Sequence, residues 1–156
     1  MKVRPNDVDA EKPNRQQIYL RALRTLPHLE IFEGNFLTHA VMMKNADGHG
    51  FTKVIKTEEK GTDVNIATHL VNDAHNGVFE LAVVVSNDSD LVEPIRVVTT
   101  ELRLPIVVVS PYERNSIELK NIASSVRHIR QGVLSVSQFP PVLRDKTGIF
   151  RKPLVW

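Results

Sequence analysis

Residues 81–109 read LAVVVSNDSDLVEPIRVVTTELRLPIVVV, and this stretch decides the fold. Two unbroken apolar runs of strand length, 81–85 and 105–109, enclose a polar cluster and a segment whose apolar residues recur at helical spacing. Unbroken apolar strands indicate burial on both faces, as in parallel sheets flanked by helices. Strand, helix and strand together span 29 residues, which is the size of a right-handed crossover. The sequence therefore predicts an α/β fold with a mostly parallel sheet.

The segments on either side extend this pattern. Just before it, we predict a helix that begins at Thr62 or Asp63 and ends at the Asn76-Gly77 pair, because its apolar residues recur at spacings of three and one. The remaining predicted elements are a helix over 14–25, strands over 29–37 and 51–57, a loop over 44–50, short helices over 117–129 and 133–139, and an extended arm over 144–156.

The composition limits the classes of function. The chain has 156 residues, is 42% hydrophobic and has no Cys, which excludes disulfide frameworks, cysteine zinc sites and thiol catalysis. No apolar run approaches the ~18 residues of a membrane span, and the first residues lack an apolar signal core, so we expect a cytoplasmic protein without a membrane partner. Residues 1–110 carry 12 basic and 15 acidic side chains, whereas 111–156 carry 8 and 3. An acidic region beside a basic tail suits an enzyme that acts on a polyanion.

Three acidic side chains are expected to meet at one edge of the sheet. Asp88 and Asp90 directly follow the first apolar strand, at the end where ligands bind in open parallel sheets. Asp63 begins the helix before that strand, and a short connection brings the start of this helix to the same edge. Such a cluster repels itself unless a cation neutralises it, and Mg²⁺ and Mn²⁺ prefer oxygen ligands. The sequence thus predicts a metal site at these three acids.

The chemistry implied by such a site is metal-assisted attack of water on a phosphodiester. A divalent ion lowers the pKa of bound water and stabilises charge on the reacting oxygens. Lys60 lies close to Asp63 in sequence and is expected to steady a phosphate group.

Other interpretations of the same acids stay open. Asp63 can be a plain helix cap, and so can Asp90, which forms a D-x-x-E box with Glu93. An Asp-x-Asp pair after a strand also occurs in Toprim-type and haloacid-dehalogenase-type sites. The dehalogenase-type site needs Thr or Val four residues after its nucleophile, where Val92 stands, but its later Ser/Thr and Lys elements do not follow clearly.

The motifs as a set resemble the NYN domain family, a branch of the PIN-like ribonucleases. An acid at a helix start, then S-x-D-S-D after a buried strand, then another apolar strand match the family in order and spacing. The stretches that carry the resemblance are EKGTDV at 59–64, AVVVSNDSDL at 82–91, LPIVVV at 104–109, SVSQFPP at 135–141 and RKPLVW at 151–156.

The resemblance implies a three-layer PIN-like α/β fold over residues 1–143, followed by a basic C-terminal arm over 144–156. It implies a bacterial, Mg²⁺- or Mn²⁺-dependent ribonuclease in which Asp63, Asp88 and Asp90 are the catalytic metal ligands. RNA is then the expected partner, and we expect Lys60, Ser86 and Asn87 to contact it.

One part of the family pattern has no counterpart in this sequence. The family opens with a strand that ends in a metal-binding Asp, and here only Asp7 and Asp9 stand near the start, in a polar loop. We therefore expect a sheet that lacks its first strand, with a free edge that an upstream segment, a partner strand or a second copy of the chain would complete. The alternative function is then a catalytically incomplete NYN-type module that binds RNA or protein.

Overall fold

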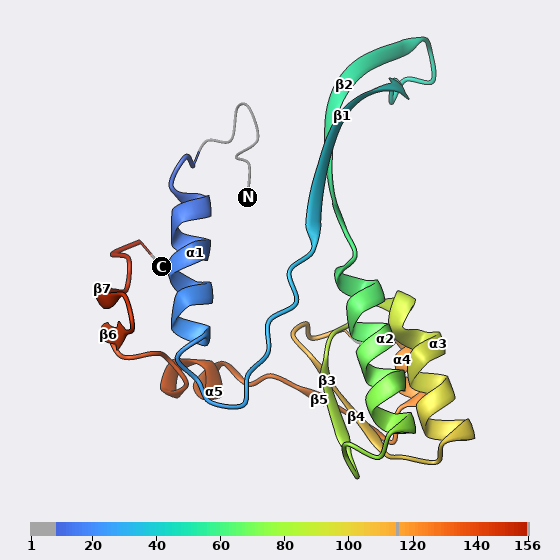
Figure 1. Cartoon of the computed structure of the whole chain (residues 1–156). Helices are drawn as coiled ribbons and strands as arrows, with labels where there is room; N and C mark the ends of the chain where they lie inside the picture. Colours follow the sequence, from blue (N-terminus) through green and yellow to red (C-terminus); the bar gives the residue numbers. More distant parts are fainter. Residues whose placement is uncertain (1–8, 115, 156) are drawn as a thin grey trace. The chain divides into compact units, whose positions relative to one another are not determined.

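The computed structural model describes residues 9–114 and 116–155, which form two compact units (Figure 1). The first unit comprises the described residues of Met1–Gly61 and Phe139–Trp156, and the second comprises those of Thr62–Gln138. The second unit is therefore one continuous stretch of chain, whereas the first is assembled from two stretches. In the described part of the chain, no helix has the length and apolar character that crossing a membrane requires.

A parallel sheet of three strands lies at the centre of the second unit. Its strands are β3 (Ala82–Val85), β4 (Ile106–Ser110) and β5 (Ser125–His128), in the order β3-β4-β5. Val84 pairs with Val108, and Val108 pairs with Val126, so all three strands end at one edge, called here the carboxyl edge. The crossover predicted from residues 81–109 is confirmed.

Helices pack on one face of this sheet. They are α2 (Thr62–His75), a continuous helical segment made of η1 (Ser89–Leu91), α3 (Val92–Arg96) and η2 (Val97–Glu101), and α4 (Ile117–Ile122). Side chains of these helices form one core with alternate residues of β3 and β4. Its buried members are Leu70, Ala74, Val84, Leu91, Ile95, Val98, Ile106, Val108 and Leu119.

The opposite face of the sheet has no such cover within this unit. Val83 and Val85 are 58% and 61% exposed, while Val84 between them is buried. The expected burial on both faces of this strand is therefore wrong within the unit, which has one layer of helices on its sheet. Among the described residues, β3 has no neighbouring strand other than β4. The three-layer arrangement and the absence of a first strand stay predictions.

The third strand was not expected from the sequence. Residues 117–129 were predicted to be helical, but α4 ends at Ile122, and Ala123 has extended backbone at φ −73° and ψ 147°. Ser124 then ties the new strand to β4, because its hydroxyl accepts a hydrogen bond from the Ile106 N–H at 3.1 Å. Pairing with β4 outweighs the helical spacing of the apolar residues. The short helix α5 (Gln131–Val136) follows β5.

The C-terminal residues fold back onto the first helix in the first unit. α1 (Lys12–Leu23) faces a hairpin of β6 (Val142–Asp145) and β7 (Gly148–Arg151), where an extended arm was expected. Arg21 donates hydrogen bonds of 2.6 and 2.7 Å to the Asp145 carboxylate and lies 4.2 Å from the centre of the Phe150 ring. At the start of α1, Asp9 pairs with Arg15, whereas Asp7 lies outside the described residues.

A long antiparallel hairpin completes the first unit. β1 (Asn35–Lys44) pairs with β2 (Phe51–Lys60) through ten residues of each strand. The predicted loop at 44–50 is the turn, where Gly48 and Gly50 have positive φ angles. The predicted strand at 29–37 is wrong over most of its length, because the strand begins at Asn35.

The contact between Arg21 and Asp145 predicts a pH-dependent part of the stability. Its hydrogen bonds lower the pKa of Asp145 below the ordinary value, so the carboxylate stabilises the folded chain at neutral pH. That contribution is lost as the pH falls through and below about 3.9, the ordinary Asp pKa. We expect Asp145→Asn to lower the midpoint of thermal unfolding by a few degrees at pH 7, with a gap that narrows in acid. Glu80→Gln, at an exposed acid of the second unit, is the control, and an equal effect of both substitutions would contradict the assignment.

Candidate metal centre

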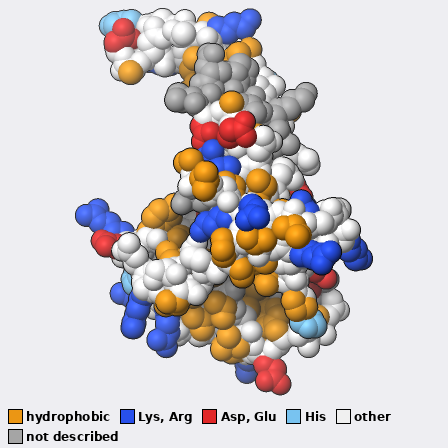
Figure 2. All heavy atoms as spheres, turned by 90° about the vertical axis from the view of Figure 1, so that its left-hand side faces the viewer, with side chains coloured by type: hydrophobic (Ala, Val, Ile, Leu, Met, Phe, Trp, Pro, Cys, Tyr) orange, Lys and Arg blue, Asp and Glu red, His pale blue; other side chains and the backbone are white. Residues whose placement is uncertain are grey.

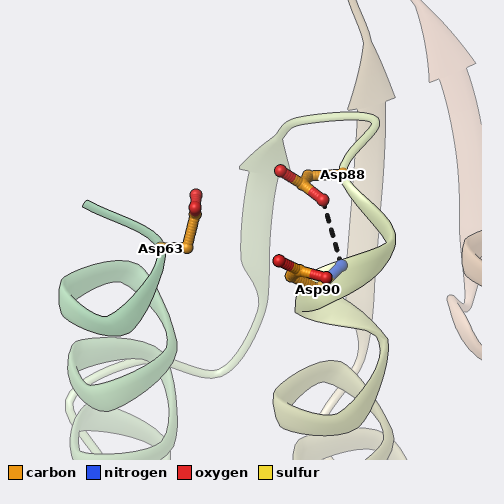
Figure 3. A group of neighbouring side chains, drawn as sticks. All are labelled: Asp63, Asp88 and Asp90. Carbon is orange, nitrogen blue, oxygen red and sulfur yellow. Dashed lines mark hydrogen bonds between the residues drawn. The ribbon is translucent and has the colours of Figure 1, made fainter. Parts of the chain in front are cut away.

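Three carboxylates meet at the carboxyl edge of the parallel sheet. Each of Asp63, Asp88 and Asp90 offers an oxygen within 4.8 Å of those of the other two, and all three residues are exposed (Figure 3). Asp63 projects from the start of α2, while Asp88 and Asp90 follow β3. The structure thus brings together the three acids that the sequence singled out.

Asp88 is held in place by the turn that it caps. Its backbone is extended, at φ −84° and ψ 126°, and its Oδ1 accepts a hydrogen bond from the Asp90 N–H at 3.0 Å. Its own N–H donates to the Ser86 hydroxyl at 3.1 Å. The expected capping box of Asp90 and Glu93 is wrong, because Asp88 is the cap and Glu93 pairs with Arg96 at 2.6 Å. The carboxylate of Asp90 is therefore not used as a cap.

Asp63 owes its position to the transition from β2 to α2. Gly61 has a φ of +101°, which is unfavourable for other residues and lets the chain turn sharply between the two elements. Asp63 then lies in the first turn of α2, where the helix dipole favours negative charge. The helix start and the turn after β3 are both anchored in the core, through Leu70 and Leu91. The distance between the acids is thus fixed by packing.

The side chain of Asn87 braces the site from behind. Its Nδ2 donates to the backbone oxygen of Arg114 at 3.2 Å, and its Oδ1 accepts from the Ser116 N–H at 2.8 Å. It therefore joins the turn after β3 to the start of α4. The amide of Asn87 and the hydroxyl of Ser86 are engaged within the protein, and their expected contacts with RNA stay predictions. Lys60 ends β2 in the first unit, where its Nζ lies 3.3 Å from Glu58.

Asp88 and Asp90 place two negative charges side by side in the acidic cluster. Within the described residues, neither Asp88 nor Asp90 lies within ion-pair distance of a basic side chain. Two carboxylates this close repel each other and a third adds to the repulsion. Exposed carboxylates with this spacing are suited to a divalent cation, which prefers oxygen ligands. The cluster therefore has the ligands for one such ion.

Two residues of the basic tail, which was expected to bind RNA, lie at the same edge of the sheet, a placement that sequence reasoning missed. β5 ends at His128, and Arg127 and Arg130 line a cavity of about 580 Å³ there, with residues of β4 and α5. Because β3 and β5 are parallel members of one sheet, this cavity opens at the same edge as the acids. The prediction of a helix over 117–129 concealed this placement. The adjacent Ser124 and Ser125, which are weak helix formers, were the available signal.

Comparisons with known proteins agree with this architecture. The NYN domain model matches residues 11–130. The enzyme 6-hydroxy-3-succinoylpyridine 3-monooxygenase HspA from Pseudomonas putida is 29% identical over an alignment of 157 positions. The alignment covers 90% of this chain and 50% of that protein. The chain thus spans half the length of that relative.

A solved structure was also found among the comparisons. It is a crystal structure of a protein of unknown function from Vibrio parahaemolyticus, which is 16% identical and superposes with a TM-score of 0.47. The match covers 80% of this chain and 64% of that one. The family match, which spans most of the chain and includes all three acids of the cluster, shows that this protein belongs to the NYN domain family.

Proposed function

We propose that the chain is a divalent-metal-dependent ribonuclease that hydrolyses RNA phosphodiester bonds at Asp63, Asp88 and Asp90. The observation that carries the proposal is the convergence of these carboxylates within 4.8 Å at the carboxyl edge of the sheet. Membership of a family with a nuclease-like fold supports it. The named activity of the Pseudomonas putida relative is not carried over, because the chain spans half of that protein.

The spacing of the acids fits a single small cation. Two oxygens on opposite sides of one Mg²⁺ lie roughly 4.2 Å apart, since each metal–oxygen distance is about 2.1 Å. The three carboxylates have oxygens within 4.8 Å of one another, so a small adjustment of the side chains brings them to one ion, and because they are exposed, substrate oxygens and water have room to complete the coordination. Mg²⁺ and Mn²⁺ are the expected ions because both favour carboxylate oxygens.

The residues of this site would divide the work of hydrolysis. Asp63, Asp88 and Asp90 would hold the cation, which lowers the pKa of a water and polarises the phosphodiester when it is bound. Asp88 is held by the hydrogen bond that its Oδ1 accepts from the Asp90 N–H, so its second oxygen stays directed at the site. Asn87 keeps the loop before α4 in place and thereby preserves the shape of the mouth. None of these positions requires a large movement when substrate arrives.

Arg127 and Arg130 are suited to hold the RNA backbone. Both are exposed and line the cavity at the carboxyl edge. Guanidinium groups bind phosphate oxygens in a bidentate manner, and phosphate contacts supply most of the affinity of sequence-independent binding. We assign them this role in addition to the one expected of Lys60.

The first prediction concerns cleavage. We expect Asp88→Asn to reduce Mn²⁺-dependent cleavage of single-stranded RNA by roughly a hundredfold or more, because it removes a charged ligand from the centre of the site. The matched control is Asp73→Asn, which changes an acid on α2 ten residues after Asp63. We expect this variant to keep its activity. Gel assays of labelled RNA, with and without chelator, measure both. Equal cleavage by the two variants would rule out this site.

The second prediction separates metal binding from turnover. Titration of Mn²⁺, followed by electron paramagnetic resonance, is expected to show one site in the wild type and a loss of affinity of at least about tenfold in Asp63→Asn. The reason is that two carboxylates neutralise less of the charge of the ion than three do. Unchanged affinity in Asp63→Asn would remove this residue from the ligand set.

The third prediction concerns RNA affinity. We expect Arg127→Gln and Arg130→Gln each to weaken RNA binding and to lower the slope of log K against log salt by about 0.7, the value for one phosphate contact on a single strand. Lys120→Gln, at an exposed cation of α4, is the control with the same loss of charge. Fluorescence anisotropy at several salt concentrations gives the slopes. A common effect of all three variants would indicate net charge in place of specific contacts.

A second candidate function is a regulatory module that binds RNA or protein without cleaving it. It is favoured by the number of acids that converge, because the family pattern includes one more, on a first strand that we expect this chain to lack. This candidate expects RNA binding that is insensitive to chelator and no cleavage with either ion. Binding of Mn²⁺ without turnover would favour it over the ribonuclease.

A further inference from the structure

The hairpin of β1 and β2 presents an unusual amount of apolar surface. Large hydrophobic side chains along it are between 43% and 66% exposed, namely Phe36, Leu37, Met42, Met43, Phe51 and Ile55. The turn of the hairpin lies at the top of Figure 2, where hydrophobic side chains stand beside charged ones. A two-stranded hairpin is marginally stable in water by itself, and three or more strands with an apolar face are needed for independent stability.

Both faces of this hairpin carry apolar side chains. Residues that pair across the strands lie on the same face, so Val41 and Val54 share one face with Leu37 and Met43. On the other face Ala40 pairs with Ile55. A hairpin with one solvent face would alternate apolar and polar residues. Apolar side chains are therefore exposed on both faces of the hairpin, and neither face has the polar character of one that contacts only solvent.

The two outer edges of the hairpin differ in a way that indicates where that protein pairs. β2 carries five charged residues among its ten, at positions 53, 56, 58, 59 and 60. Charges of this kind protect an edge strand from pairing with another chain. β1 has one formal charge, at its last residue Lys44, and it has no Pro. Among the described residues, β1 pairs with no strand besides β2. The edge of β1 is therefore the unprotected one.

The charge of the hairpin does not favour a nucleic acid as the occupant. From Asn35 to Lys60 it holds four Lys against three acidic residues. Glu58 contacts two of those lysines, Lys56 at 2.5 Å and Lys60 at 3.3 Å, and they lower its pKa. The hairpin therefore has a net formal charge of only +1, which gives a polyanion little electrostatic attraction. The hairpin surface is therefore better suited to contact with protein than with nucleic acid.

We propose that β1 pairs in antiparallel fashion with β1 of a second copy of the chain. A twofold axis places the same edge on both sides, so the unprotected strands meet each other and the charged β2 strands become the outer edges. The product is a four-stranded sheet, which passes the threshold that the isolated hairpin does not reach. This pairing is independent of the metal centre, and its test does not use activity.

When the two β1 strands overlap over their full length, the twofold axis determines which residues approach each other. A twofold axis perpendicular to the sheet brings the middle of β1, at His39, Ala40 and Val41, next to the same residues of the second copy. Phe36 from each copy then lies toward the Met42 and Met43 end of the other. Corresponding residues of β2 are separated by three strand spacings, or about 14 Å. A disulfide requires Cα atoms within about 7 Å, so only the first set is within reach.

Single cysteines provide the test, because the natural chain has none. We expect one of His39→Cys, Ala40→Cys and Val41→Cys to form a covalent dimer rapidly on mild oxidation. Ile55→Cys, on the cross-strand partner of Ala40 and on the same face, is the matched control and stays monomeric under the same conditions. Gel electrophoresis without reductant measures both. Cross-linking of Ile55→Cys as rapid as that of the fastest β1 variant, or no cross-linking of any β1 variant, would overturn the proposal.

Sedimentation equilibrium of the unmodified chain gives a second measurement. We expect a mass of twice 17.6 kDa. In Ala40→Lys the dissociation constant of the dimer is expected to rise about tenfold, because the substitution places two like charges near the axis. Ile55→Lys adds the same charge to the already charged strand and keeps the dimer. A wild-type monomer at the highest soluble concentration would overturn the proposal. RNA that protects cysteines of β1 from alkylation in such a monomer would assign the edge to nucleic acid.

Discussion

The packing of one sheet face against three helical segments is the constraint on which the rest of the second unit depends. Val84, Ile106 and Val108 are buried on this face, against side chains of α2, the helical segment after β3, and α4. Because these contacts fix the start of α2 against the end of β3, two acidic segments that are 25 residues apart in sequence, at Asp63 and Asp88, face each other (Figure 3). The site can be exposed and still be rigid, because the buried core holds the start of α2 and the end of β3 in place. Repulsion among its carboxylates is opposed by buried apolar contacts.

Sequence reasoning succeeded where a pattern was local and failed where long-range pairing decided the structure. The strand in the apolar run at 81–85, the helix at Asp63 and the second strand of the crossover were predictable from spacing alone, and so was the meeting of three acids. β5 was not, because residues 125–128 carry a spacing that also suits a helix and owe their extended form to β4. The basic residues of the cavity were lost with it. The expected cap at Asp90 failed for a different and local reason, since Asp88, two residues earlier, caps the same turn.

The two sides of the parallel sheet show how far apolar sequence alone can be interpreted. Val83, Val84 and Val85 are equivalent in composition, yet only Val84 is buried within the unit. A continuous apolar run therefore reports what a strand is suited to contact, and the second contact need not lie in the same stretch of chain. The hairpin of β1 and β2 follows the same logic, with apolar residues on both faces. In both places the sequence encodes burial that the unit itself does not supply.

The contact between Arg21 and Asp145 joins residues that are 124 positions apart. It joins the two stretches of the first unit, and the second unit is inserted between them in the sequence as one continuous stretch, between Gly61 and Phe139. During synthesis the inserted unit is complete before the C-terminal strands leave the ribosome, so it can fold while α1 still lacks its partner. The acidic cluster is thus assembled from residues that are synthesised early. The contact between α1 and the hairpin of β6 and β7 forms last. Loss of a few C-terminal residues would therefore affect maturation of the first unit and leave the acidic cluster formed.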